Sequence, residues 1–565
     1  MTVLVRRRFV QVEGRRVHYR TMGSGPPALF IHSSLTNSAF VIPEMAVVAD
    51  RYTCFCFDTP AFGLSDPLPL TEVTMADLAD ATVAAMDAVG LPPCPVFGSH
   101  TGAAVALELA FRYPERVTGV MLDGIPVFTT EEAGAAGVAY FAPLVPDPLG
   151  GHYSATWTRF RDQSVWFPWF GRHPDCLNDV DMNPPESIHN WTKMFFNAAE
   201  HYKPAYMAAW AYGDGAIVAA SGLTVPAIIT ATTTDMLHAH LKRLPPMRPD
   251  QEIREVGRSH DVRRALTREA FDRFGSPGEA PDAPSSLGPT AAVARQFIDV
   301  GDRQLLLRHA GNHAMPVIVL LHDFPGSSLA LEPLINELAV RHFVLAFDLP
   351  GSGESAPLGS TDLNAFADMV WHGCDAAGVK QAILHGAGFG SSVAIEMATQ
   401  LPHRVTALSL SGVLLPDAAE RADLRANFAP PAMVENDGSH WYRTWLMLRD
   451  SLVYWPWYRT KRDGLRRVPA NFEAAHLHHW TFEVVKQLDG YHEAIHAALD
   501  HDAAVALAAF DGTVLLWSDP LNALSATYDT RLKAVRPDAA LHDIAGLAHL
   551  LQPARDAANL RSSRS

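Results

Sequence analysis

The sequence contains an internal repeat, and a repeat constrains the fold more than any other feature because it implies two copies of one structural unit. The stretch VFGSHTGAAVALELA (96–110) recurs as LHGAGFGSSVAIEMA (384–398), an offset of 288. The clearest match aligns GGHYSATWTRFRDQSVWFPW (150–169) with GSHWYRTWLMLRDSLVYWPW (438–457), where nine of 20 positions are identical. We therefore expect a tandem duplication in this chain of 565 residues.

The predicted domains are 1–274 and 295–565, because the Pro-, Gly- and Ser-rich segment 275–294 is typical of a linker. Each half opens with an alternating, hairpin-like segment. In the first half, the short apolar runs ALFIHS, TCFCFD, PVFGS, VMLDG and AIITA then alternate with helical patterns. This alternation predicts an α/β fold with a doubly wound, mainly parallel sheet in each half.

Further motifs recur at turns that follow the predicted strands. The first half has FIHSSLTNS and FDTPAFGLS, the second has LLHDFPGS and FDLPGSGES, and both have a glycine-flanked strand-to-helix turn. With these motifs each half resembles the α/β-hydrolase superfamily, in the branch that carries a helical lid after the sixth strand. The resemblance covers nearly the whole chain and implies lids at about 128–222 and 413–507. It also implies a nucleophile, an acid and a histidine, in that order, at the carboxyl edge of the sheet.

In the first half the resemblance assigns the nucleophile position to His100, in the turn G-x-His-x-G. Asp235, which follows the strand AIITA, is expected to be the acid, and His260 in REVGRSHDV the histidine. Asp123, after the strand VMLD, is the alternative acid position. We expect Asp235 to accept a hydrogen bond from His260, and His260 to face His100, so that the two rings share a proton.

The backbone N–H groups of Ser34 and Thr101 are the expected oxyanion donors. Ser99 precedes the tip of the turn and is expected to point away from the pocket. His32 is expected to be structural.

In the second half the same positions carry Gly388, Asp519 and His549, and Asp323 stands where the oxyanion turn normally has glycine. Glycine tolerates the backbone of such a turn but has no reactive group. We therefore expect the second half to be a degenerate copy.

These residues predict an enzyme that hydrolyses a small, largely apolar carbonyl or ester compound at the N-terminal site. A His-Asp-His set would replace the usual Ser-Asp-His set, either by activating water or through an acyl-imidazole. A cofactor-independent lyase or isomerase, and a non-catalytic pseudo-hydrolase that binds a ligand or partner, remain open. Two histidines and a carboxylate could also suit a metal, but two ligands are too few, so no metal and no cofactor is expected.

The lid segments agree best between the two copies. We expect Trp157, Trp169 and Trp191 to form the core of the lid or to line an apolar pocket beneath it. Arg161 and Asp162 are expected to pair with each other, with a substrate carboxylate as the alternative partner of Arg161. A repeated lid favours pairing of the two domains within one chain, and copies of the chain could pair in the same way.

Charge and composition exclude several partners. The net charge is −16 and the only basic block is at 6–8, so neither nucleic acid nor an anionic membrane surface is expected to bind. The five cysteines are scattered without a C-x-x-C pair, and no apolar run has the length of a membrane span. A small-molecule substrate and a cytoplasmic location are therefore expected.

Overall fold

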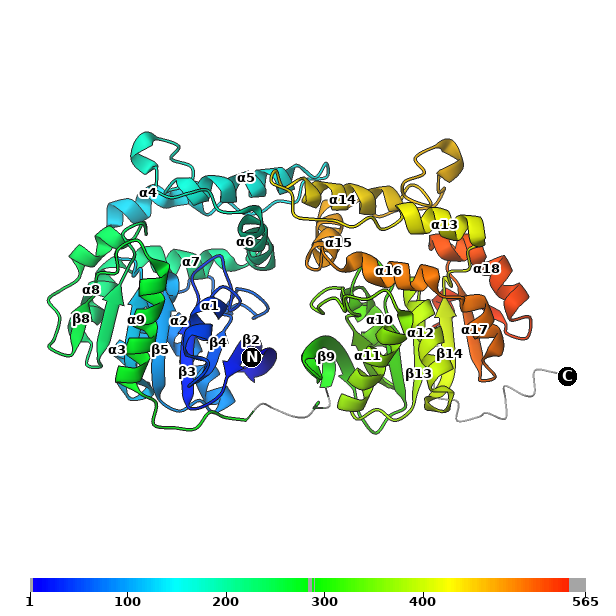
Figure 1. The fold of residues 1–565 in the computed structure, drawn as a ribbon, viewed down its shortest axis with the longest axis horizontal. Coiled ribbons are helices and arrows are strands. Elements are labelled where there is room, and N and C mark those ends of the chain that lie inside the picture. The colour runs from blue at the N-terminus through cyan, green and yellow to red at the C-terminus, as the bar shows by residue number, and fades with distance from the viewer. Residues whose placement is uncertain (1–3, 283–286, 289, 548–565) are drawn as a thin grey trace. The chain divides into compact units, whose positions relative to one another are not determined.

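A computed structural model describes residues 4–282, 287–288 and 290–547. The chain divides into two compact units, one formed mainly by Met1–Val145 and His152–Pro284, the other mainly by Ser285–Glu435 and Ser439–Ser565. We call them the N-terminal unit, blue to green in Figure 1, and the C-terminal unit, green to red.

Each unit contains one eight-stranded sheet. The strand order is β1-β2-β4-β3-β5-β6-β7-β8 in the N-terminal unit and β9-β10-β12-β11-β13-β14-β15-β16 in the C-terminal unit. In the N-terminal unit the strands are β1 (Val5–Val12), β2 (Arg15–Gly23), β3 (Pro27–Ile31), β4 (Thr53–Phe57), β5 (Cys94–Ser99), β6 (Val117–Asp123), β7 (Ala227–Thr230) and β8 (Gln251–Ile253). In the C-terminal unit they are β9 (Thr290–Val300), β10 (Arg303–Gly311), β11 (Val317–Leu321), β12 (Phe343–Phe347), β13 (Ala382–Ala387), β14 (Val405–Ser411), β15 (Val514–Ser518) and β16 (Leu541–Asp543).

The second strand of each sheet pairs antiparallel with both neighbours, and all the other pairs are parallel. The two sheets therefore have the same topology, and the predicted doubly wound, mainly parallel fold is confirmed in both halves.

Helices connect the strands and cover both faces of each sheet (Figure 1). The helices of the N-terminal unit are α1 (Ile42–Val48), α2 (Met75–Val89), α3 (Thr101–Arg112), α4 (Thr130–Tyr140), α5 (Gly151–Val165), α6 (Pro185–Ala198), α7 (Tyr202–Ala211), α8 (Gly213–Gly222) and α9 (His260–Phe274). Those of the C-terminal unit are α10 (Glu332–Leu338), α11 (Leu363–Ala376), α12 (Phe389–Gln400), α13 (Ala418–Asn427), α14 (Ser439–Ser451), α15 (Ala474–Val485), α16 (Tyr491–Asp500), α17 (Ala503–Ala509) and α18 (Ala523–Val535). In both units a group of helices, α4–α8 and α13–α17, lies between the sixth and seventh strands; we call each group the helical insert.

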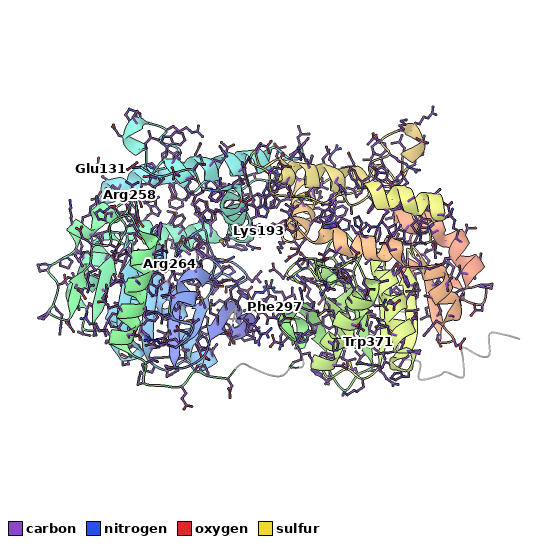
Figure 2. The ribbon with its side chains drawn as sticks, viewed as in Figure 1. Glu131, Lys193, Arg258, Arg264, Phe297 and Trp371 are labelled. Carbon is purple, nitrogen blue, oxygen red and sulfur yellow. The ribbon has the colours of Figure 1, made fainter. Side chains whose placement is uncertain are left out.

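The core explains why the strands have continuous apolar sequences. On β11, Val319 and Leu321 pack into one hydrophobic cluster, and Ile318 and Leu320 pack into another. Successive side chains of a strand point to opposite faces, so both faces of this sheet are buried. Helix α11 contributes Trp371, labelled in Figure 2, which is buried and donates to the backbone carbonyl of Met397 at 3.1 Å.

Within the described residues, no helix combines the length and the apolar character needed to cross a membrane.

Candidate active site

His100 lies at the tip of a tight turn between β5 and α3; we call this turn, and the corresponding turn between β13 and α12, the elbow. Its φ of 48° is in the left-handed region, which side chains other than glycine rarely adopt. Two glycines permit the turn: a Cβ at Gly98 would lie 2.2 Å from the carbonyl oxygen of Gly102, and a Cβ at Gly102 would lie 2.2 Å from that of Ile31. The sequence pattern of this turn is therefore required by its backbone, whatever side chain occupies the tip.

His100 forms a direct ion pair with Asp235. The Nε2 atom of His100 lies 2.8 Å from Oδ2 of Asp235, and Oδ1 of Asp235 accepts from the backbone N–H of Leu237 at 2.8 Å. Asp235 occupies a turn after β7, the strand next to β6, so parallel packing brings its carboxylate to the elbow. The side chains of His100 and Asp235 are 36% and 13% exposed.

The pair favours the charged form of both groups. Burial opposes a positive charge on His100, but the Asp235 carboxylate outweighs it and raises the pKa of His100 to about 9. Burial also opposes the charge on Asp235, and the imidazolium again prevails, lowering the pKa of this carboxyl. Because Asp235 is ionised, it can only accept, so Nε2 carries the proton of the shared hydrogen bond.

The predicted His-Asp-His arrangement is wrong. His260 is exposed and is the first residue of α9, where Ser259 caps the helix by accepting from the backbone N–H of Val262. Over the described parts of the chain, His260 makes no hydrogen bond to Asp235 or His100. Since the helix begins at His260 itself, its side chain remains at the solvent-facing end, and Asp235 bonds the elbow directly.

A buried ionic group that the sequence did not predict lies beside the elbow. Arg263, on α9, lies 2.8 Å from Asp123, and the same guanidinium bonds Glu44. All three side chains are at most 10% exposed. Arg264, labelled in Figure 2, also reaches Glu44, at 3.2 Å.

Asp123 therefore pairs with Arg263 through its carboxylate, whereas Asp235 is the carboxylate that bonds the His100 ring. Burial raises the pKa of Asp123 to about 6, against the opposing effect of Arg263. The sequence signal for this group was weak, because Glu44, Asp123 and Arg263 are separated by 79 and 140 residues along the chain.

The two expected oxyanion donors are unobstructed. Among the described residues, no acceptor is bonded to the backbone N–H of Ser34 or of Thr101. The preceding turn is held by His32, whose Nδ1 lies 2.8 Å from the carbonyl oxygen of Ser33 and whose Nε2 accepts from the backbone N–H of Thr59 at 3.0 Å. His32 thus has a structural position in this turn.

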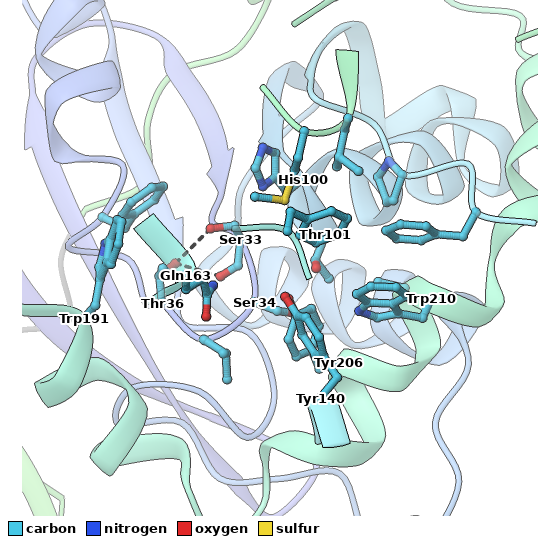
Figure 3. Close-up of a pocket in the computed structure, with 18 of the residues that line it drawn as sticks. Ser33, Ser34, Thr36, His100, Thr101, Tyr140, Gln163, Trp191, Tyr206 and Trp210 are labelled. Atoms are coloured by element: carbon cyan, nitrogen blue, oxygen red, sulfur yellow. Dashed lines mark hydrogen bonds between the residues drawn. The ribbon is translucent and has the colours of Figure 1, made fainter. Parts of the chain in front are cut away.

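A cavity of about 180 Å³ lies in front of His100 and Thr101 (Figure 3). Six aromatic side chains from the segment between β6 and β7 line part of its wall: Tyr140, Phe160, Phe167, Trp191, Tyr206 and Trp210. In the close-up, Trp191 and Gln163 lie on one side of the cavity and Trp210 lies on the other. The Oε1 atom of Gln163 and the Oγ atom of Ser34 belong to residues that line the cavity, and both are buried with no hydrogen-bond partner in the described chain.

Of the aromatic residues proposed from the sequence, Trp191 lines this cavity. Trp157, on α5, is 2% exposed, and the ring of Trp169 lies 5.3 Å from the guanidinium of Arg159; neither is part of the cavity wall. The predicted pairing of Asp162 with Arg161 is wrong, because Asp162 accepts from Arg172 at 2.7 Å. Adjacent residues on a helix point in different directions, which separates Arg161 from Asp162.

In the C-terminal unit the elbow has the same backbone without a side chain at its tip. Gly388 has a φ of 55°, close to that of His100. His549 lies outside the described residues. Asp519 accepts from the backbone N–H of Leu521, and it is Asn522 that takes the position of Asp235. A Cβ at Gly124 would lie 3.0 Å from Oδ2 of Asp235, and a Cβ at the corresponding Gly412 would lie 3.0 Å from Oδ1 of Asn522.

The prediction that Asp519 occupies the acid position of the second half is therefore wrong. Asn522, three residues later, occupies it. Two residues in one loop cannot be distinguished by sequence when the loop geometry decides which of them reaches the elbow. Within the described residues, neither unit gathers three or more His, Cys, Asp or Glu side chains in a group that could hold a metal ion.

Comparison with known proteins identifies the fold. Residues 26–153 and 316–446 match the family model described as alpha/beta hydrolase fold. The sheet order and the two matches show that the chain has the α/β-hydrolase fold twice in tandem. A solved structure, that of E-2-(acetamidomethylene)succinate hydrolase, aligns with a TM-score of 0.37 and 23% identity over 48% of this chain and 99% of that one.

Curated relatives are similar over shorter stretches. The dihydrolipoyllysine-residue acetyltransferase component of the acetoin cleaving system of Cupriavidus necator is 36% identical over 20% of this chain and 30% of its own length. The 2-(acetamidomethylene)succinate hydrolase of Mesorhizobium japonicum is 32% identical over 21% of this chain and 43% of its own length. The 2-hydroxy-6-oxo-6-phenylhexa-2,4-dienoate hydrolase of Comamonas testosteroni is 28% identical over 23% of this chain and 43% of its own length. The chain therefore spans less than half the length of each of these relatives.

Proposed function

We propose that the N-terminal unit hydrolyses a small, largely apolar ester or related carbonyl compound, with the His100–Asp235 pair in place of a serine nucleophile. The observation that carries this proposal is the placement of a histidine and two free N–H donors on one wall of an aromatic cavity. The several hydrolases of small compounds among the relatives support the reaction class.

In the proposed reaction the substrate carbonyl oxygen accepts from the backbone N–H groups of Ser34 and Thr101. Nε2 of His100 is held by Asp235, so Nδ1 is the nitrogen that takes a proton from water. The water oxygen bonds to the carbonyl carbon, and the negative charge moves to the carbonyl oxygen, where the two N–H groups stabilise it. The bond to the leaving alcohol then breaks, and the alkoxide receives the proton from Nδ1.

The high pKa of His100 sets the pH dependence of this reaction. With a pKa of about 9, only a minority of His100 is neutral at pH 7, so kcat/KM rises with pH and levels off above about pH 9.

The test uses a panel of short aliphatic and aromatic p-nitrophenyl esters, with a serine-directed fluorophosphonate as a second probe. We expect turnover by the intact chain, loss of at least about 100-fold in His100→Ala, as for removal of a general base, and no labelling at the elbow by the fluorophosphonate. The variant Asp162→Asn, which alters an ion pair of the helical insert, is the matched control. Turnover that survives His100→Ala would exclude this mechanism.

The same pKa favours a second candidate. A histidine that is mostly protonated at neutral pH is a proton donor, which suits a cofactor-independent lyase or isomerase. In that case the rate falls, rather than rises, as pH increases through about 9. A third candidate, a ligand-binding pseudo-hydrolase, predicts that small apolar carbonyl compounds raise the Tm of the wild type and of His100→Ser equally, without turnover.

A further inference from the structure

The oxyanion turn of the C-terminal unit holds a carboxylate of its own chain. The Oδ1 atom of Asp323 accepts from two backbone N–H groups, those of Phe324 and Phe389, each at 2.8 Å. Phe389 follows the tip of the elbow as Thr101 does in the N-terminal unit, and Phe324 follows Asp323 as Ser34 follows Ser33. One carboxylate oxygen thus lies where both oxyanion donors of this unit converge.

Gly388, at the tip of the elbow, leaves the space that the Asp323 carboxylate occupies. A Cβ at Gly388 would lie 1.9 Å from Oδ1 and 2.0 Å from Cγ of Asp323. Any side chain at position 388 therefore requires Asp323 to move. In the N-terminal unit the corresponding pair is reversed, with a small side chain at Ser33 and a large one at His100.

A third position also differs between the units: Asn522 stands in the C-terminal unit where the N-terminal unit has Asp235. Burial raises the pKa of Asp323 to about 6, and Asn522, which takes the position of Asp235, acts against this increase through its amide. A carboxylate at this position would repel Asp323, whereas an amide N–H donates to it. Asp323, Gly388 and Asn522 form a consistent set: an anion, the space it needs and a donor to hold it.

The C-terminal unit has a much smaller cavity between residues that correspond in sequence to the cavity wall of the N-terminal unit. The cavity lined by Pro325, Leu448 and Ser451 has a volume of about 20 Å³. Its counterpart in the N-terminal unit, lined by Leu35, Phe160 and Gln163, has about 180 Å³. The smaller cavity has no room for an ester substrate.

We propose that Asp323 is a resident carboxylate ligand of an anion site formed by the N–H groups of Phe324 and Phe389 and the Asn522 amide, and that this site binds a small external carboxylate once the Asp323 side chain is removed. The resident ligand keeps the C-terminal unit from accepting a carbonyl substrate. The site is thus a liganded anion site rather than an empty remnant of a catalytic one.

The first test is a double-mutant cycle measured by thermal unfolding of the full chain. Gly388→Ala inserts a Cβ against Asp323, and overpacking of this kind is expected to lower the Tm of the unit by about 5–10 °C. In the background Asp323→Ser, which copies Ser33, the same change is expected to lower it by only about 2–4 °C, the strain of a positive φ. Gly390→Ala is the matched control, because its Cβ would meet the backbone oxygen of His322 at 2.4 Å in either background.

The second test uses sodium acetate as the probe, against sodium chloride of equal ionic strength and against neutral acetamide. In protein labelled with ¹⁵N-phenylalanine, acetate is expected to shift the Phe324 and Phe389 amide resonances of Asp323→Ser and to leave them unchanged in the wild type. Asp323→Asn, which keeps the side-chain volume, serves if Asp323→Ser does not fold; its amide oxygen occupies the site, so acetate should have no effect. An equal effect of Gly388→Ala in both backgrounds, or Phe amides of folded Asp323→Ser that ignore acetate, would overturn the proposal.

Discussion

Replacing Asp235 by Asn tests whether the carboxylate sets the charge of His100. The substitution keeps the size of the side chain and removes its charge, leaving burial as the main influence on the imidazole. We expect the pKa of His100 to fall from about 9 to below its ordinary value of 6.5. A ¹H–¹⁵N NMR titration of the histidine ring nitrogens measures this directly.

The same substitution has a predictable effect on stability. A histidine pKa raised from 6.5 to about 9 corresponds to about 3 kcal/mol of pairing free energy if fully expressed. The His100 side chain is 36% exposed, so solvent screening reduces the expected value to about 1–2 kcal/mol. Because the pKa is higher in the folded state, this stabilisation is complete below about pH 6.5 and is lost as pH rises through about 9.

Urea unfolding at pH 6 and pH 10 provides the assay. Asp235→Asn should lower the free energy of unfolding by about 1–2 kcal/mol at pH 6 and by less at pH 10. Asp162→Asn is the control, because it removes an ion pair with an arginine rather than with a histidine, so its small effect should not change with pH. The reasoning is refuted if wild-type His100 titrates near 6.5, or if Asp235→Asn has the same effect at both pH values.

Three further predictions concern neighbouring residues. His260→Ala should leave kcat/KM within about 2-fold of the wild type and the free energy of unfolding within about 0.5 kcal/mol, because the side chain is exposed; a large loss of ester turnover would restore His260 to the site. Arg263→Met should destabilise the N-terminal unit by about 3–5 kcal/mol in urea unfolding, because Asp123 then remains buried without its cation and Glu44 keeps only Arg264; a change below 1 kcal/mol would contradict this. Gln163→Leu should favour fully apolar over hydroxyl-bearing esters in kcat/KM, since it removes one free acceptor of the cavity; an unchanged preference would place the substrate elsewhere.

Much of the fold could be predicted from the sequence because its signals are local. The apolar runs predict the strands, and the glycines around each elbow indicate a tight turn; both patterns involve only a few neighbouring residues. The repeat, with its offset of 288 residues, extends these predictions to the second half. Gly98 and Gly102 are needed wherever a strand turns this tightly into a helix, so they mark His100 and, through the repeat, Gly388. Asp235 was expected to be the acid from the family resemblance and from its place after the strand AIITA, and the structure brings it to His100.

The partners across the site could not be predicted in the same way. His260 was expected from its position late in the half, but the helix starts at that residue and the next inward side chain is Arg263. Asp519 and Asn522 share one loop, and only the course of that loop decides that Asn522 reaches the elbow.

By itself the sequence determined the duplication, the two doubly wound sheets and the residues at both elbow tips, because these are recognised from similarity between the two halves and from patterns of residues that are close together in the chain. Only the tertiary structure decided which polar groups bind one another. Asp235 pairs with His100, Arg263 pairs with Asp123, and Asp323 accepts from the backbone N–H groups of Phe324 and Phe389. The physical reason is that a hydrogen bond requires atoms within about 3 Å, and only packing of the strands and loops brings side chains distant in sequence to that separation.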